Sequence, residues 1–268
     1  MSNLQLRVIS AVVLAAAVLG LTFLGGLPFR LLSALIGAAV YYEWTRMARS
    51  RVAWGGTDMA HDALMAIFLI ALVAGLPATW LLPALAALVL VAALFPARRW
   101  EAPGILYAGL SCFSLALLRD DDRSGLVAML FLFAVVWATD IFAYFVGRAV
   151  GGPKLAPSIS PGKTQSGALG GAVGGVVAGL LLAAAAGAAN LAALGIVALL
   201  ISVVSQAGDL FESWVKRRHG RKDSGALIPG HGGVMDRVDG LVAAAFTLYV
   251  IGWITASAEH PAHGLFPA

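Results

Sequence analysis

Apolar runs of bilayer-spanning length recur along the whole chain, and they constrain its fold more than any other feature. A helix of about 20 apolar residues crosses the hydrocarbon core of a membrane and satisfies its own backbone polar groups there. Nine such runs lie at residues 8–24, 30–46, 62–76, 79–96, 104–119, 125–147, 166–188, 190–208 and 237–258. We therefore predict an all-α fold, a polytopic integral membrane helical bundle of about nine transmembrane helices.

The composition excludes a soluble globular domain. Charged residues make up 12% of the 268 residues, whereas about a quarter of the residues are charged in soluble domains. The net charge of +4 comes from short basic clusters between the apolar runs, which is typical of membrane loops and not of a nucleic-acid-binding surface. The lipid bilayer is thus a predicted partner and nucleic acid is not.

The basic residues also predict an orientation, because cytoplasmic loops carry the excess of lysine and arginine. With nine spans, 15 of the 18 lysines and arginines fall on one side, and only Arg30, Arg119 and Arg123 fall on the other. The N-terminus is therefore predicted to be cytoplasmic and the C-terminus to lie on the opposite side. On that opposite side Asp120, Asp121 and Asp122 form an acidic loop; adjacent carboxylates diverge, so a solvated turn is favoured over a cation site.

Two regions are expected, and we interpret them as one structural unit. Residues 1–124 hold about five spans, and residues 125–268 form a catalytic region of about four spans with cytoplasmic loops at 148–165 and 209–237. In the seventh span, glycines recur every fourth residue and so share a helix face, which permits close packing; they are Gly167, Gly171, Gly175 and Gly179. The packing partner is either a helix of the same chain or a second copy in a homodimer.

The strongest candidate site lies where the eighth and ninth spans face each other. If the eighth helix continues beyond the membrane, Asp209, Glu212, Ser213 and Lys216 share one face, and Asp236 and Asp239 share a face at the start of the ninth span. Converging carboxylates are typical ligands of Mg²⁺. The loop between them adds basic residues and the glycine-rich run Pro229 to Gly233, which suit phosphate, so the segment favours metal-assisted transfer at phosphorus over simple attraction to anionic lipids.

Two further segments carry candidate residues. Asp140 lies in the sixth span with Tyr144 at i+4 and Arg148 at i+8, so it is either a structural contact or a site carboxylate. In the loop SPGKTQSG, Lys163 and Thr164 precede a helix and either hold phosphate or form an ordinary basic loop. A P-loop is excluded because Pro157 stands where that motif needs glycine, and no β-strand is predicted before this helix.

The segment GDLFESWVKRRHGRKDSGALIPGHGGVMDRVDG, residues 208–240, resembles the signature of the phosphatidate cytidylyltransferase (CDP-diacylglycerol synthase) family. The matching elements are a serine, Lys-Arg, Lys-Asp, Pro-x-His-Gly-Gly and Asp-Arg-x-Asp. The resemblance extends to SPGKTQSG and to Asp140 through Arg148, which is roughly the C-terminal half. Gly162 and Ser166 depart from the family's loop, where a lysine and a glutamate stand.

This resemblance implies an enzyme that joins CTP to phosphatidic acid with Mg²⁺, giving CDP-diacylglycerol and pyrophosphate, and it leaves a second cation open. It implies a bacterial inner membrane location with the active site facing the cytoplasm. The implied catalytic residues are Asp209, Asp236, Lys222, Asp223 and Asp239, with Asp209, Asp236 and Asp239 as metal ligands. The implied substrate-binding residues are Ser213, Lys216, Arg217, His231, Gly232, Gly233, Arg237, Ser160, Lys163, Thr164, Asp140, Tyr144 and Arg148.

Two alternatives stay open at this point. A CTP-dependent lipid kinase would use the same phosphate-binding parts but release CDP. An ion-coupled membrane transporter would use Asp140 as its coupling site, although such proteins place charged or broken-helix features near mid-membrane in several spans. Here the polar residues concentrate on one side.

Overall fold

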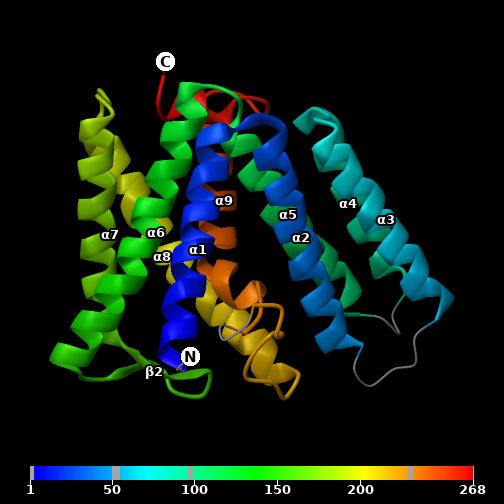
Figure 1. Cartoon of the computed structure of the whole chain (residues 1–268), viewed down its shortest axis with the longest axis horizontal. Helices are drawn as coiled ribbons and strands as arrows, with labels where there is room; N and C mark the ends of the chain where they lie inside the picture. The colour runs from blue at the N-terminus through cyan, green and yellow to red at the C-terminus, as the bar shows by residue number, and fades with distance from the viewer. Residues whose placement is uncertain (1–2, 50–54, 96–98, 229–231, 268) are drawn as a thin grey trace.

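The computed structural model describes residues 3–49, 55–95, 99–228 and 232–267, and the side chains of the first helix from Ile9 onward. These residues form nine α-helices that run up and down one bundle (Figure 1). The helices are α1 (Asn3–Leu24), α2 (Gly26–Ala48), α3 (Gly56–Val73), α4 (Ala78–Ala93), α5 (Glu101–Arg119), α6 (Arg123–Val150), α7 (Gln165–Ala185), α8 (Leu191–Arg218) and α9 (Met235–Thr255), followed by the 3₁₀ helix η2 (Pro261–Gly264).

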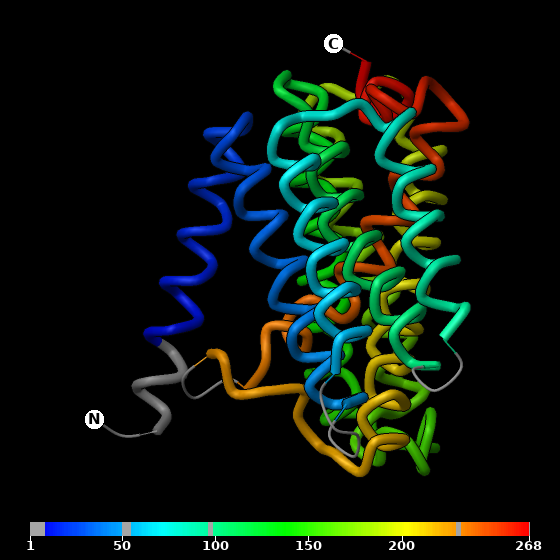
Figure 2. Tube along the Cα trace, turned by 90° about the vertical axis from the view of Figure 1, so that its right-hand side faces the viewer, coloured from blue at the N-terminus to red at the C-terminus, as the bar shows by residue number. Residues whose placement is uncertain are grey.

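Six of the described helices are long and apolar enough to cross a membrane, namely α3 and α5 through α9. The prediction of a helical, polytopic membrane bundle is therefore confirmed. Figure 1 shows the two ends of the chain at opposite ends of the bundle, and Figure 2 shows α1 at its edge, where it contacts α2 and α6. The number of spans and the side on which each terminus lies stay predictions.

The helices extend further into the predicted loops than expected. α8 runs to Arg218 and α9 begins at Met235, so the loop predicted at 209–237 is shorter, at 219–234. Likewise α6 reaches Val150 and α7 begins at Gln165, so the connection predicted at 148–165 is shorter, at 151–164. In the last turns of α8, which lie outside an apolar run, Glu212 and Lys216 are one turn apart and form an ion pair of 2.6 Å, which contributes to the stability of the helix.

A short β-hairpin precedes α7. Strands β1 (Lys154–Ala156) and β2 (Ser160–Thr164) pair antiparallel, with Lys154 opposite Thr164. The expectation that no strand precedes this helix was therefore wrong, because strands this short carry no detectable alternation of polarity. We call the end of the bundle that carries this hairpin the hairpin end, and the opposite end, where α5 turns into α6, the far end (Figure 1).

The glycine face of α7 packs against α6 of the same chain. Its four glycines, Gly167, Gly171, Gly175 and Gly179, are buried. A Cβ atom on Gly171 would lie 2.7 Å from the carbonyl oxygen of Thr139, which is too close for any side chain. The interpretation of this face as a packing surface is thus confirmed within the chain, while a homodimer stays a prediction.

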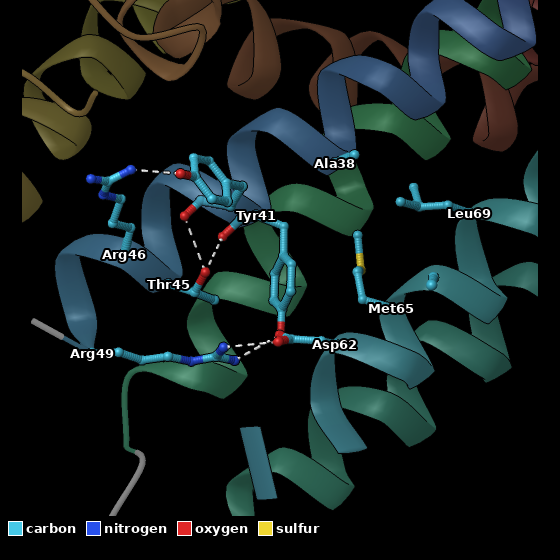
Figure 3. A pocket seen from close by; sticks show the side chains of 10 residues that line it. Ala38, Tyr41, Thr45, Arg46, Arg49, Asp62, Met65 and Leu69 are labelled. Atoms are coloured by element: carbon cyan, nitrogen blue, oxygen red, sulfur yellow. Dashed lines mark hydrogen bonds and ion pairs between the residues drawn. The ribbon is translucent and has the colours of Figure 1, made fainter. Parts of the chain in front are cut away.

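A buried ion cluster joins three helices at the hairpin end. Arg49, directly after α2, lies 2.9 Å from Asp62 of α3 and 2.7 Å from Glu101 of α5. Figure 3 shows Arg49 reaching Asp62 beside a pocket of 530 Å³ between α2 and α3. The Glu101 side chain is only 2% exposed, and a buried carboxylate is tolerated only with such a partner. The cluster fixes the end of α2, which also carries Glu43.

Candidate active site

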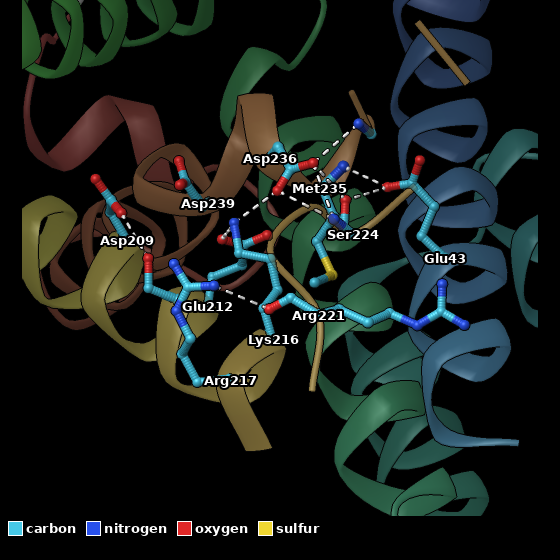
Figure 4. A network of polar contacts seen from close by, with 12 residues as sticks. Glu43, Asp209, Glu212, Lys216, Arg217, Arg221, Ser224, Met235, Asp236 and Asp239 are labelled. Atoms are coloured by element: carbon cyan, nitrogen blue, oxygen red, sulfur yellow. Dashed lines mark hydrogen bonds and ion pairs between the residues drawn. The ribbon is translucent and has the colours of Figure 1, made fainter. Parts of the chain in front are cut away.

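Two glycines bring the carboxylates of α8 and α9 together. A Cβ atom on Gly208 would lie 2.9 Å from the carbonyl oxygen of Asp239, and one on Gly240 would lie 2.9 Å from that of Ser205. The two helices therefore cross at glycines whose absent side chains let the backbones touch. Asp209 and Asp239 are the sequence neighbours of these glycines, so the crossing sets their carboxylates side by side (Figure 4).

Lys163 joins this pair from the β-hairpin. Its Nζ atom forms an ion pair with Asp209 Oδ2, and Asp140 and Asp239 are both close enough to Asp209 and Lys163 to interact with them electrostatically. Three carboxylates from three helices thus converge around a single lysine. Because like charges repel at this range, the group favours a further positive charge.

A pocket of 650 Å³ opens beside this cluster at the hairpin end. Its walls come from α6, the hairpin, α7 and α8, and its polar lining residues include Asp140, Tyr144, Arg148, Lys163, Thr164, Gln206 and Asp209. Within it Arg148 donates a hydrogen bond of 3.3 Å to the hydroxyl of Tyr144. Asp140 lines the same pocket beside Asp209, so the structure favours the interpretation as a site carboxylate over a structural contact with Tyr144 or Arg148.

Asp236 belongs to a separate, adjoining network (Figure 4). Lys216 Nζ lies 2.6 Å from Asp236 Oδ1 and 2.6 Å from Glu212 Oε2, so one cation bridges two buried carboxylates. Asp236 Oδ2 accepts hydrogen bonds of 2.9 Å from the Ser224 hydroxyl and from the Gly233 backbone nitrogen. Both Asp236 oxygens thus have protein partners, as both Asp209 oxygens do, and the convergence of Asp236 and Asp209 on one metal ion stays a prediction.

Glu43 of α2 anchors the loop between α8 and α9. Its buried carboxylate accepts hydrogen bonds from the backbone nitrogens of Val234 at 3.0 Å and Met235 at 2.8 Å. Its Oε2 atom also lies 2.9 Å from the Ser224 hydroxyl oxygen, whose single proton serves either Glu43 or Asp236. Sequence reasoning missed Glu43, although a lone carboxylate within an apolar run is a default functional signal. Its partners lie 181 to 192 residues away along the chain, which no local pattern reveals.

The remaining predicted residues surround these networks. Ser213 Oγ is 3.5 Å from Asp209 Oδ1. Arg217 Nε donates a hydrogen bond of 3.4 Å to the carbonyl oxygen of Ile159, which lies in the hairpin turn directly before Ser160, so this contact links α8 to the hairpin. Thr164 caps α7 by accepting from the Gly167 nitrogen at 3.1 Å. Lys222, Asp223 and Arg237 are exposed, Gly232 adopts a positive φ of 82°, and His231 lies outside the described residues.

Comparison with known proteins decides the family. The profile of the cytidylyltransferase family matches residues 5–255, nearly the whole chain. The chain belongs to this family. Similar proteins named phosphatidate cytidylyltransferase occur in Brucella suis, at 50% identity over 97% of each chain, in Pseudomonas aeruginosa, at 37% identity over 93% of this chain and 98% of the relative, and in Bacillus subtilis, at 31% identity over 94% and 98%.

Membership in the cytidylyltransferase family makes the protein an enzyme and confirms the resemblance inferred from residues 208–240. It also extends that resemblance, because the match covers the N-terminal helices, which sequence reasoning regarded only as hydrophobic spans. The contact between Glu43 and the loop before α9 supplies a physical reason why the N-terminal helices belong to the same unit of function.

Proposed function

We propose that this cytidylyltransferase condenses CTP with phosphatidic acid to give CDP-diacylglycerol and pyrophosphate. The relatives that carry the name phosphatidate cytidylyltransferase support this reaction. The observation that carries the proposal is the crossing of α8 and α9 at Gly208 and Gly240, which sets Asp209 and Asp239 side by side next to Lys163. Carboxylates that gather around a cation beside a pocket lined also by Arg148 suit a metal-bound triphosphate.

Mg²⁺ is the proposed cofactor, and the donor set fits it. Asp209 and Asp239 are the proposed ligands, with Asp140 close by, because hard cations prefer carboxylate oxygen. Asp236 is a further proposed ligand, and it binds the ion where Lys216, 2.6 Å from its Oδ1 atom, gives way, as Lys163 does at Asp209. Bound Mg²⁺ supplies positive charge that offsets the charge of the triphosphate. A second cation stays a further proposal for the same cluster.

The reaction requires the protein mainly to position the lipid phosphate and CTP. An oxygen of the lipid phosphate attacks the α-phosphorus of CTP, the new phosphorus–oxygen bond forms, and the bond to the bridging oxygen breaks so that pyrophosphate leaves with the electron pair. The attacking oxygen is already anionic, so no strong general base is needed. Lys163 and Arg148, which line the polar pocket, hold phosphate oxygens in line for this displacement.

An apolar groove supplies a place for the acyl chains. It has a volume of 320 Å³ and lies between α5, α8 and α9, with Tyr107, Gly208, Phe211 and Phe246 among its lining residues. Gly208 borders this groove, and its neighbour Asp209 lines the polar pocket. We therefore place the lipid tails on one side of α8 and the nucleotide on the other.

The proposed setting is the inner membrane of a bacterium. We propose nine spans with a cytoplasmic N-terminus and a C-terminus on the opposite side, so that the hairpin end faces the cytoplasm, where CTP is present. The bias of lysine and arginine toward the loops at that end supports this orientation.

A pyrophosphate-release assay tests the function. The purified protein with Mg²⁺ and phosphatidic acid should release pyrophosphate with CTP and far less with other nucleoside triphosphates, and CDP-diacylglycerol should appear in equal amount. Asp209→Asn and Asp239→Asn should each lower kcat/KM by about a hundredfold or more, while Asp121→Asn at the far end should not. Formation of CDP instead would indicate a lipid kinase, and substrate flux into liposomes without nucleotide would indicate a transporter.

A further inference from the structure

Two histidines and two aspartates face one another at the far end of the bundle. His260 Nδ1 lies 2.6 Å from Asp120 Oδ2, and His263 Nε2 contacts Asp122 Oδ2. The two imidazole rings stack nearly parallel, with centroids 5.2 Å apart and planes 13° apart. The aspartates come from the turn between α5 and α6 and the histidines from the segment around η2, which lie together in Figure 1.

The acidic loop alone does not make a cation site, because its three adjacent carboxylates diverge. The tertiary structure changes this by bringing histidines from 140 residues further along the chain. One potential ligand atom each from Asp120, His260 and His263 lies within 4.8 Å of the others. Tetrahedral zinc with bonds of about 2.1 Å needs ligand atoms about 3.4 Å apart, so modest rotation of the exposed His260 and His263 side chains closes the group around an ion.

The carboxylates are held in the orientation that a metal ligand requires. Asp120 Oδ1 accepts a hydrogen bond of 2.8 Å from the Asp121 nitrogen, and Asp122 Oδ1 accepts one of 2.8 Å from the Gly125 nitrogen. Each carboxylate is thus fixed through one oxygen and presents the other to a histidine. Backbone partners of this kind are the usual outer support of metal-ligating carboxylates.

The histidines are held as well. Their segment is anchored by Ala262, which is fully buried, and by Phe266, whose ring centroid lies 5.4 Å from that of Phe131. The buried Arg119 does not compete for the cluster, because its guanidinium donates to the carbonyl oxygens of Asp120 and Asp122 and not to their side chains. Among the described residues, the ion pairs of the Asp120 and Asp122 carboxylates are both with histidine.

We propose that Asp120, Asp122, His260 and His263 bind a divalent transition-metal ion of the zinc class at the far end of the bundle. Two imidazoles with two carboxylates favour zinc, cobalt or nickel over magnesium, whose sites are built from oxygen alone. The site is therefore chemically distinct from the carboxylate cluster at the hairpin end. A bound ion clamps the C-terminal segment to the turn between α5 and α6.

Cobalt titration of the purified full-length protein in detergent, with Mg²⁺ present throughout, tests the site. One Co²⁺ per chain should bind with the visible absorption of a tetrahedral or five-coordinate nitrogen and oxygen site, and Zn²⁺ should displace it. Zn²⁺ should also raise the Tm. The double variant His260→Ala/His263→Ala should lose the absorption and the shift in Tm, and the milder His263→Gln should weaken Co²⁺ binding at least about tenfold.

His219→Ala is the matched control, because His219 also follows a helix but lies at the hairpin end. It should bind Co²⁺ as the wild-type protein does. Elution as a single species from a size-exclusion column shows that each variant is folded. Co²⁺ absorption that persists in both the double variant and His263→Gln overturns the proposal. The proposal is also overturned if the wild-type protein binds no Co²⁺ at micromolar concentration and its Tm does not respond to Zn²⁺. The cluster is then two histidine–aspartate ion pairs and not a metal site.

Discussion

The carboxylate of Glu43 lies 2.8 Å from the backbone nitrogen of Met235, although the two residues are 192 positions apart in the chain. Met235 begins α9, where the first backbone N–H groups have no partner within the helix. A carboxylate at that position satisfies two of these groups and interacts favourably with the positive end of the helix. The contact sets where α9 starts, and therefore how Asp236 and Asp239 are placed.

Glu43→Gln should lower both activity and stability. The amide has one acceptor oxygen where the carboxylate has two, and its NH₂ group faces backbone donors, so we expect a loss of about 1–3 kcal/mol in the free energy of unfolding. Because the first turn of α9 is then held less firmly, Asp236 and Asp239 are positioned less accurately, and kcat should fall at least about tenfold. Thermal melts and pyrophosphate release measure the two effects.

Glu259→Gln is the matched control for this variant. Glu259 accepts hydrogen bonds of 2.8 and 3.0 Å from the nitrogens of Ala78 and Thr79, and so caps α4 as Glu43 caps α9. It should lose some stability, though less than Glu43→Gln because Glu259 is partly exposed and Glu43 is buried, and it should keep its kcat. Equal losses of kcat in the two variants would mean that Glu43 acts through general stability alone.

Gly240→Ala should impair the enzyme by separating α8 from α9. The new Cβ atom would lie 2.9 Å from the carbonyl oxygen of Ser205, so the helices must move apart and carry Asp239 away from Asp209. Pyrophosphate release should fall at least about tenfold, since displacements near 1 Å at a site can cost up to a hundredfold. Gly195→Ala, on the partner helix α8, is the control, because its Cβ atom meets nothing closer than 3.5 Å; a similar loss there would contradict the explanation.

Asp209→Asn and Asp236→Asn should differ in stability although both lower activity. Asp236 is 9% exposed and pairs with Lys216, so its neutralisation leaves the bridging lysine with Glu212 alone and should cost about 3 kcal/mol of stability. Asp209 pairs with Lys163 but also lies close to Asp239, and both partners of the pair are 29% exposed. Asp209→Asn therefore exchanges a solvent-screened ion pair for relief of carboxylate repulsion and should change the Tm little. Thermal melts in detergent measure the difference; a lower Tm for Asp209→Asn than for Asp236→Asn would reverse this assignment.

Arg49→Gln should destabilise the N-terminal helices. Arg49 is the cation shared by Asp62 and Glu101, and the Glu101 side chain is 2% exposed, so removal of the charge leaves a buried carboxylate unpaired at a cost of about 3 kcal/mol. Arg46→Gln is the control, since Arg46 is exposed and donates to the hydroxyl of Tyr42. Equal melting temperatures for the two variants would show that the Arg49 cluster contributes no more than a surface charge.

Much of the fold could be predicted because a membrane helix is identified by the hydropathy of its own segment, without knowledge of its neighbours. Each predicted apolar run falls largely within an observed helix. Hydropathy did not predict the turns that extend α8 to Arg218, because these turns carry charged residues, among which Glu212 and Lys216 form an ion pair. The hairpin of β1 and β2 escaped prediction because its strands are held by backbone pairing and carry no sequence period.

The sequence by itself determined the membrane location, the helical class, the family signature and the residue types of the site, because apolar length and motif spacing are local properties. Only the tertiary structure decided which carboxylates meet. The crossing at Gly208 and Gly240 brings Asp209 and Asp239 together, Lys216 pairs with Asp236, and Glu43 joins from the N-terminal half. Helix crossings depend on side-chain volume at contacts between distant segments. The spacing of residues within one helix does not determine which other helix it will pack against.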